Sequence, residues 1–298
     1  MTPPLLDAIT KSMSLSFISS EPLLQVNHLS VVFAGSGPET LAAGREEDGA
    51  LEALKDVSFE LEAGSFACVI GASGSGKSTL LRVLAGLVKP TSGEVRFWRA
   101  CGGGRPKVGL VFQQANLMPW RTVLENIMLP FELKKASRAE AEARALELLE
   151  LVGLAGFERS WPRDLSGGMA QRVAIARSLM HDPDLLLLDE PFGALDALTR
   201  ERMGAELLRI WQARRKTVLM VTHSINEALF LSDRVLVLSS RPGQVCLDLK
   251  VPLPRPRSEA MHYTAEFGEM ARCLRAAIDT EAAVTANRAA GFRPAAAD

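Results

Sequence analysis

The sequence predicts an α/β fold, in which a mostly parallel sheet carries helices between its strands and a separate helical lobe is inserted. Three observations predict this fold. Short β-rich runs alternate with helical patterns, an order typical of parallel sheets. The apolar run at 66–70 passes through a glycine-rich turn directly into a helical pattern at 77–87. The stretch from about 115 to 178 interrupts the alternation with helical patterns, so we assign it to the inserted lobe.

The composition is that of a folded, charge-balanced chain. Apolar residues make up 47% of the 298 residues, which suffices for a sizeable core and excludes disorder throughout. Lysine plus arginine (34) nearly balance aspartate plus glutamate (35), so no global field favours nucleic acid or anionic lipid. The four cysteines lack the spacing of a zinc site or a disulfide framework, which suits a reducing cytoplasm. No run approaches the roughly 20 apolar residues of a membrane-spanning helix, so a membrane connection would need a partner.

The N-terminal part of the chain predicts two strands that flank an insertion. The first twenty residues make a poor signal peptide, and we expect residues 1–22 to form a flexible tail. β-rich runs follow at 24–33 and 53–61. The segment between them, 34–50, is polar, rich in glycine and without periodicity, so we expect a flexible hairpin insertion.

The remaining elements follow in order along the chain. Strands are predicted at 94–98, 107–112, 184–188, 217–222 and 234–238, and helices at 137–151, 165–180, 197–213 and 225–231. Ser137 is the predicted cap of its helix, with Glu140 three residues on. After Arg241 we expect an edge strand, a proline-rich linker, a weak helix at about 264–278 and a disordered alanine-rich end.

A phosphate-binding loop lies between the strand at 66–70 and the helix that follows it. The pattern G-x-x-x-x-G-K-S is complete from Gly71 to Ser78. Glycines let successive backbone N–H groups turn inward to an anion, and the start of the helix adds partial positive charge. Lys77 is expected to bind the β- and γ-phosphates of a nucleotide, and the Ser78 hydroxyl a magnesium ion. The predicted nucleotide-binding residues of this segment are Gly71, Ala72, Ser73, Gly74, Ser75, Gly76, Lys77, Ser78 and Thr79.

Two adjacent carboxylates follow an apolar run, at the position where such sheets bind ligands. Leu185 to Leu188 is apolar, and Asp189 and Glu190 end it. Asp189 is expected to hold magnesium, and Glu190 to orient and polarise an attacking water. The alternative for Asp189 and Glu190 is that they belong to an ordinary solvated turn. The alternative for the segment from Gly71 to Ser78 is a chance glycine-serine turn. Together the motifs predict a P-loop NTPase, a class that includes kinases, GTPases and motor ATPases.

A second anion-binding pattern begins about ninety residues after the loop. Ser166, Gly167 and Gly168 start a predicted helix, where a hydroxyl and bare backbone amides can hold a phosphate. Two phosphate-facing helix starts in one chain suggest that two nucleotides are held between two chains. A capped helix after a glycine turn is the alternative. The whole segment resembles the LSGGQ-type signature of the ABC transporter ATPases, and its residues are Leu165, Ser166, Gly167, Gly168, Met169, Ala170 and Gln171.

The resemblance to ABC transporter ATPases extends over roughly residues 24–243 and implies further site residues. It implies a RecA-like, mostly parallel core sheet with an antiparallel β subdomain and a helical signature subdomain. Gln113 matches the glutamine that touches magnesium and the water, and Asp196 matches the loop that crosses the dimer interface. His223 matches the switch histidine that contacts the γ-phosphate, and Phe33 matches the aromatic residue, usually tyrosine, that stacks on adenine.

The same resemblance implies a division of the chain into domains. An ABC ATPase domain would span 23–243, with the helical subdomain at about 115–178 inserted in its core. The flexible tail of residues 1–22 would precede it, and a partly disordered extension of residues 244–298 would follow. The insertion at 34–50 lies just past the adenine-stacking position, where it either alters nucleotide access or extends into solvent.

Several residues resemble the importer branch that serves nitrate, sulfonates and taurine. Pro119, Trp120 and Arg121 are typical of that branch, and so are the segment 191–200 and the LSGGM form of the signature. Exposed apolar character around Trp120 suits a groove that receives a short helix of a membrane subunit. Core packing is the alternative for Trp120.

These resemblances imply a transport function that depends on ATP and Mg²⁺. Two chains, as a homodimer or a pair of similar ATPases, would pack head to tail with the phosphate loop of one facing the signature of the other. Hydrolysis would drive import of a small anion such as nitrate, sulfonate or taurine through integral membrane permease subunits. A periplasmic or extracellular solute-binding protein would take part indirectly. The chain is expected as a peripheral protein at the cytoplasmic face of the inner membrane.

Two alternatives stand beside the importer interpretation. A soluble ABC ATPase that acts on nucleic acid or the ribosome usually has tandem modules or a long coiled coil, whereas this chain has one module, no sustained heptads and no basic stripe, and we expect no nucleic-acid partner. A sensor that binds nucleotide without hydrolysing it would not need the complete catalytic set. Met169 and Ser224 replace commoner family residues, but neither replaces a phosphate or magnesium ligand.

Overall fold

The computed structural model describes residues 22–34, 50–98, 106–133 and 137–289, with side chains up to Glu281. Residues 279–289 of the alanine-rich end are helical, so the disorder predicted there is wrong. The rest of that end, the predicted N-terminal tail and the 34–50 insertion lie outside these ranges, apart from single residues at their edges. Their structure is therefore a prediction from the sequence.

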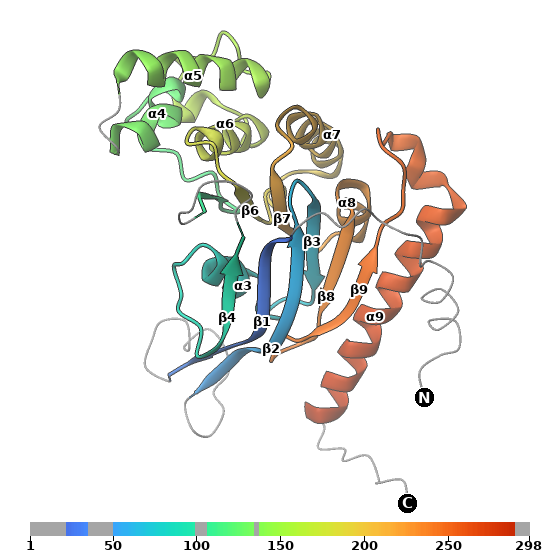
Figure 1. The fold of residues 1–298 in the computed structure, drawn as a ribbon. Helices are drawn as coiled ribbons and strands as arrows, with labels where there is room; N and C mark the ends of the chain where they lie inside the picture. Colours follow the sequence, from blue (N-terminus) through green and yellow to red (C-terminus); the bar gives the residue numbers. More distant parts are fainter. Residues whose placement is uncertain (1–21, 35–49, 99–105, 134–136, 290–298) are drawn as a thin grey trace, which may run out of the picture.

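Six strands form the core sheet, in the order β5, β6, β7, β3, β8 and β9 (Figure 1). Their bounds are β3 Phe66–Gly71, β5 Val108–Val111, β6 Leu185–Asp189, β7 Thr217–Val221, β8 Arg234–Leu238 and β9 Val245–Lys250. All neighbouring pairs are parallel except β8 with β9. Every residue of β3 is buried, so the loop that follows it leaves the sheet from a fixed position. The predicted, mostly parallel sheet is confirmed.

A smaller antiparallel sheet packs beside the core, in the order β2, β1 and β4 (Figure 1). Its strands are β1 Pro22–Phe33, β2 Leu51–Glu62 and β4 Ser92–Phe97. Together with α3 (Lys77–Leu84), they bury one face of the core sheet, the face that receives Ala67 and Val69 of β3. Phe66, Cys68 and Ile70 point to the opposite face, as the two-residue period of a strand requires.

Three helices form a group at the top of Figure 1, in the stretch assigned to the helical lobe. They are α4 (Val123–Leu133), α5 (Arg138–Leu151) and α6 (Gly167–Leu179), and each packs against the other two. Ser137 lies at the N-cap of α5 as predicted, but its side chain makes no cap hydrogen bond, so that detail of the prediction is wrong. The helix of residues 77–87 also ends early, because Gly86 turns to a φ of 74°.

The C-terminal part of the chain is tied to α8 (Ile225–Leu231) by a buried arginine. Arg257 donates to the carbonyl oxygens of Leu229 at 2.9 Å, Phe230 at 3.0 Å and Ser232 at 2.7 Å. Carbonyl groups at the C-terminal end of a helix have no N–H partner within the helix, and Arg257 supplies donors at this end of α8. Burial lowers the pKa of Arg257 to about 10. A short 3₁₀ helix, η2 (Glu259–Tyr263), and α9 follow, and α9 (Ala265–Ala289) is longer than the helix predicted at 264–278.

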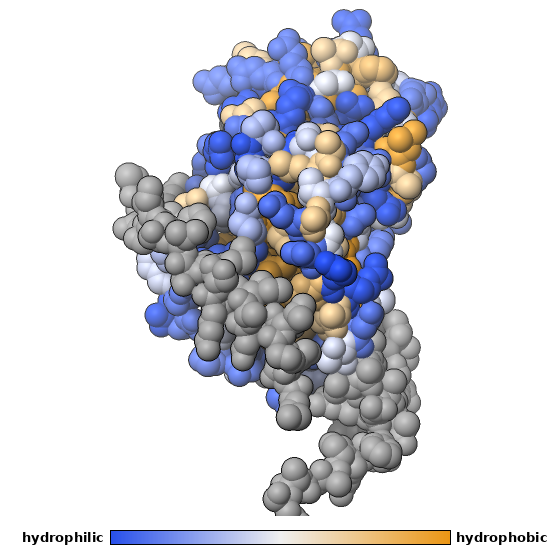
Figure 2. Space-filling view, turned by 90° about the vertical axis from the view of Figure 1, so that its right-hand side faces the viewer, coloured by the Kyte–Doolittle hydropathy of each residue, from blue (hydrophilic) through white to orange (hydrophobic). Residues whose placement is uncertain are grey.

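The side of the molecule that carries α9 faces the viewer in Figure 2. Hydrophilic residues make up most of its upper part, and hydrophobic ones gather toward the middle. None of the helices in the described ranges is both long enough and apolar enough to span a membrane. The core sheet continues past residue 243, because β9 hydrogen-bonds to β8. The sheet therefore does not mark the predicted domain boundary at residue 243, and that boundary stays a prediction.

Candidate active site

The loop between β3 and α3 passes so close to its neighbours that glycine is needed at two positions. A Cβ on Gly71 would lie 2.6 Å from the carbonyl oxygen of Leu238, and one on Gly76 would lie 2.6 Å from that of Ala53. Gly76 also has a φ of 88°, which side chains with a Cβ rarely adopt. The loop is thus held between β8 and β2, at the carboxyl end of the core sheet, where ligands of such sheets bind.

Lys77 lies inside this loop. Its Nζ donates to the carbonyl oxygens of Gly71 at 3.0 Å and Ala72 at 2.8 Å, and the residue is 6% exposed. Burial lowers the pKa of Lys77, and the charges of Glu190 and Asp189 act in the opposite direction. The ammonium is therefore fixed at the centre of the loop, where phosphate oxygens would stabilise its charged form.

Ser78 and Asp189 place two oxygen atoms that could bind a metal ion next to each other. The Ser78 hydroxyl donates to Oδ1 of Asp189 at 3.0 Å. Burial raises the pKa of Asp189, although the bond from Ser78 lowers it. No cluster of three or more His, Cys, Asp or Glu side chains that could hold a metal occurs within the described ranges. This donor set fits magnesium, which is usually held by one or two protein oxygens together with substrate phosphates.

The chain turns sharply at Glu190, directly after β6. Glu190 has a φ of 44°, which costs a non-glycine residue about 1–3 kcal/mol, and its N–H donates to the Val221 carbonyl at 3.0 Å. The turn places Oε2 of Glu190 3.4 Å from Nδ1 of His223. Gln113 lies near Glu190 as well, because both side chains border Gly193. A Cβ added to Gly193 would lie 3.1 Å from Nε2 of Gln113 and 3.5 Å from Oε2 of Glu190. The three predicted catalytic side chains therefore converge from the ends of three neighbouring strands.

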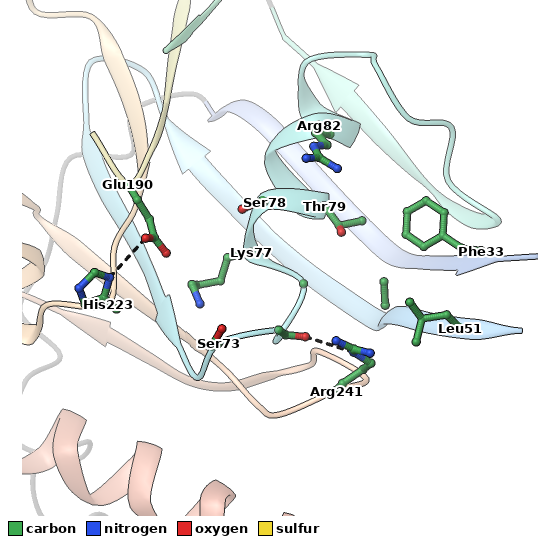
Figure 3. A pocket seen from close by; sticks show the side chains of 13 residues that line it. Phe33, Leu51, Ser73, Lys77, Ser78, Thr79, Arg82, Glu190, His223 and Arg241 are labelled. Carbon is green, nitrogen blue, oxygen red and sulfur yellow. Dashed lines mark hydrogen bonds and ion pairs between the residues drawn. The ribbon is translucent and has the colours of Figure 1, made fainter. Parts of the chain in front are cut away.

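A pocket of about 620 Å³ lies between Lys77, Ser78, Glu190 and His223, whereas Gln113 and Asp189 are not among its lining residues (Figure 3). In Figure 3, Glu190 and His223 lie at one end of it and Phe33 and Leu51 at the other. Its lining residues are Phe33, Leu51, Ala53, Ser73, Gly74, Gly76, Lys77, Ser78, Thr79, Arg82, Glu190, His223 and Arg241. The sequence prediction missed Leu51, Ala53, Arg82 and Arg241, since no motif marks them and only folding brings them to the loop.

The signature segment does not complete this pocket within one chain. Ser166 caps α6, and its Oγ accepts a hydrogen bond from the N–H of Met169 at 3.3 Å. Gly167 packs on the same chain, since a Cβ there would lie 3.3 Å from a methyl carbon of Leu195. None of the signature residues is among those that line the described pocket.

Comparison with known proteins places the chain in a family. The family model described as ABC transporter matches residues 54–193. The nitrate import ATP-binding protein NrtD of Synechocystis sp. is 47% identical over 233 residues, which are 78% of this chain and 83% of that protein. The chain belongs to the ABC transporter ATP-binding proteins. This confirms the resemblance stated from the sequence.

Further ABC proteins support the same assignment. The taurine import ATP-binding protein TauB of Rhizobium johnstonii is 43% identical over 260 residues, covering 85% of this chain and 95% of that protein. Among solved structures, a dimeric post-hydrolysis state of the ATP-binding cassette MJ0796 with ADP and Pi matches with a TM-score of 0.63 and 35% identity. That match covers 78% of this chain and 100% of the cassette. The predicted ABC-type P-loop NTPase fold and the prediction of an ATP-hydrolysing enzyme are confirmed.

In this ABC protein, the segment around Asp196 is linked to the one that carries His223. Asp196 caps α7 (Ala197–Arg214) by accepting from the N–H of Thr199 at 2.9 Å, and this bond lowers the pKa of Asp196. Arg200 donates to the Leu195 carbonyl at 3.0 Å, and its Nε lies 3.4 Å from Oε1 of Glu227. Glu227 in turn accepts from the Thr222 hydroxyl at 2.5 Å. Burial, the largest influence, raises the pKa of Glu227. Ser224 caps α8 in place of the commoner aspartate.

Gln171 of the ABC signature differs from its neighbours because its side chain points into its own chain. It is 3% exposed, and its Nε2 donates to the Phe112 carbonyl at 3.1 Å, directly before Gln113. The Gln171 side chain is therefore not placed to act across a dimer interface. Its bond ties α6 to the segment that leaves β5.

We expect Gln171→Ala to lower the free energy of unfolding by about 1–3 kcal/mol, since the buried side chain of Gln171 and its hydrogen bond to the Phe112 carbonyl would be lost. The measurement is thermal or urea unfolding of the isolated protein. Gln113→Ala is the matched control, because Gln113 is exposed and should leave stability unchanged while it lowers ATP turnover. Equal stability of Gln171→Ala and the wild type would contradict the structural role.

Proposed function

We propose that this chain is the ATP-hydrolysing subunit of an ABC importer for a small anion such as nitrate, a sulfonate or taurine. The observation that carries the proposal is the convergence of the buried Lys77, of Ser78 and of the Glu190–His223 pair on one pocket, with Asp189 bonded to Ser78. The printed names of the relatives, which are nitrate and taurine import ATP-binding proteins, support the importer branch and the class of solute.

The site residues take these roles in ATP hydrolysis. Lys77 and the amides of the loop bind the phosphates, and the ring of Phe33 stacks on adenine. Glu190 accepts a proton from the water that attacks the γ-phosphorus, and His223 orients Glu190 and contacts the γ-phosphate. Magnesium held by Ser78, Asp189 and Gln113 would neutralise phosphate charge.

A second chain completes the site in this proposal. The signature residues of one chain, apart from the inward-pointing Gln171, cover the nucleotide held by the loop of the other, and Asp196 lies at the crossing between the chains. ATP thereby joins two chains, as a homodimer or a pair of similar ATPases. The dimeric state of the matched cassette structure supports this arrangement.

Integral membrane permease subunits are the proposed partners, and a periplasmic or extracellular solute-binding protein takes part through them. The chain would act at the cytoplasmic face of the inner membrane. The nearly balanced charge of the chain favours this function over one on nucleic acid.

Uptake measurements test the proposed function. A strain that lacks this chain should lose uptake of one labelled solute among nitrate, alkanesulfonates and taurine, and the wild-type chain should restore it. The Glu190→Gln variant should not restore uptake although it is present in equal amount. Unchanged uptake of all three solutes in the deletion strain would contradict the importer assignment.

Trp120 is the proposed contact with the permease. It is 68% exposed, so the alternative that it packs in the core is wrong. We expect Trp120→Ala to weaken association with the permease by at least about tenfold, because aromatic residues dominate the energy of many interfaces. Association is measured by co-purification from detergent, and ATP affinity on the isolated chain should change little.

Trp161→Ala is the matched control for Trp120, since Trp161 is less exposed at 39% and belongs to the same helical region. It should leave co-purification of the permease at the wild-type level. Co-purification that Trp120→Ala and Trp161→Ala lower equally would remove the specific role of Trp120.

A further inference from the structure

The turn between β8 and β9 presses against the phosphate loop. The N–H of Gly243 donates to the Ala53 carbonyl at 3.0 Å, and the Gly243 carbonyl accepts from the N–H of Lys55 at 3.0 Å. A Cβ on Gly243 would lie only 2.1 Å from the carbonyl oxygen of Ser75. Glycine is therefore required here, and the turn touches the loop that would bind phosphate.

The turn is also held internally by one side chain. The Ser239 hydroxyl donates to the Pro242 carbonyl at 3.1 Å and accepts from the N–H of Gln244 at 2.9 Å. Ser239 is buried, so water competes little for these bonds. Arg241, which lies between these residues, thus projects from a fixed backbone.

The side chain of Arg241 extends along the phosphate loop into the pocket (Figure 3). Its Nε donates to the Gly74 carbonyl at 3.3 Å, and its Nη2 lies 2.9 Å from the position that a Cβ on Gly74 would occupy. No carboxylate within the described ranges forms an ion pair with it. The guanidinium is therefore a positive charge at the pocket, fixed by one neutral hydrogen bond.

We propose that Arg241 is a further nucleotide-binding residue, whose guanidinium attracts the phosphates of ATP from beside Gly74. This inference rests on the proposed ATP site. Lys77 already lies close to Asp189 and Glu190, whose charges offset its own. Arg241, by contrast, forms no ion pair with a carboxylate in the part of the chain that the structure describes. A guanidinium is always charged and donates several N–H groups to phosphate oxygens. Glu190 and His223 lie at the other end of the pocket in Figure 3, so Arg241 acts on binding and not on the chemical step.

Two substitutions separate the charge of Arg241 from its bulk. Arg241→Met keeps an apolar stem but removes the charge, and Arg241→Lys keeps the charge. We expect Arg241→Met to raise the Kd and the KM for ATP about tenfold with a kcat within about twofold of the wild type. Arg241→Lys should restore most of the affinity. The loss should shrink as the salt concentration rises from about 0.05 M to 0.5 M, because salt screens exposed charges.

Arg272→Met is the matched control, since Arg272 is exposed on α9 and its ion-pair partner in the described ranges is Glu269. It should bind ATP as the wild type does. Wild-type affinity for ATP in Arg241→Met would overturn the inference. An equal loss of ATP affinity in Arg241→Lys and Arg241→Met at every salt concentration would also overturn it, because it would indicate that Arg241 acts through packing against the loop. Nucleotide-free melting temperatures show whether each variant is folded. Failure of the wild type to hydrolyse ATP would instead contradict the proposed function. Failure of the Arg241 inference and failure of the proposed function are therefore distinguishable.

Discussion

Glu190→Gln is expected to lower the kcat for ATP hydrolysis by at least about 100-fold, since the amide cannot accept a proton from the attacking water. The two side chains are nearly isosteric, so the φ of 44° at residue 190 and the contact with His223 need not change. ATP affinity should therefore stay within about twofold of the wild type. Phosphate release in steady state gives the kcat, and binding of labelled ATP gives the affinity.

The same variant should accumulate a dimer when ATP is present, because the nucleotide that joins two chains is no longer consumed. Size-exclusion chromatography with and without ATP measures this. Glu201→Gln is the matched control, as Glu201 is exposed on α7 and should keep both turnover and the wild-type elution. Undiminished hydrolysis in Glu190→Gln would remove Glu190 as the base, and a strictly monomeric ATP-bound variant would remove the composite site.

Lys77→Ala is expected to weaken ATP binding by at least about 100-fold, because charge-assisted bonds to phosphate would be lost from the centre of the loop. In the wild type, Nζ of Lys77 lies within 3.0 Å of two loop carbonyl oxygens, so it also holds the loop in shape. Calorimetry or a fluorescent ATP analogue measures the affinity. Turnover should fall below detection at ATP concentrations that saturate the wild type.

Lys89→Ala serves as the control for Lys77→Ala, since Lys89 is an exposed lysine after α3 and does not line the pocket. A melting temperature for each variant separates loss of binding from loss of folding. Normal ATP affinity in a folded Lys77→Ala protein would contradict the assignment of the phosphate loop.

The structure agrees with the sequence prediction where the information is local. Gly76 and Lys77 were predicted from a single short pattern, and the clash that a Cβ would cause at Gly76 explains why that pattern needs glycine. Ser166 was predicted as a helix start, and its hydroxyl caps α6. Asp189 ends an apolar strand and lies at the carboxyl edge of the sheet, as strands alternating with helices require.

The prediction failed where a side chain had two plausible directions. Gln171 belongs to the signature by its order in the chain, yet it points inward to the Phe112 carbonyl. A helix presents some of its residues to the core and others to the surface, and which face is buried depends on the helices and strands beside it. Ser137 likewise stands at the N-cap of α5 without bonding to it, since cap geometry depends on a rotamer as well as on position.

From the amino-acid order alone, one could derive the phosphate loop, the acidic strand end, the signature and the family, because each is a short motif whose residues act together as neighbours. Folding was needed to bring Arg241 to Gly74, which lies 167 positions earlier, and to turn Glu190 toward His223. Such contacts arise when the sheet sets distant strands side by side, and local patterns carry no record of which strand ends will meet.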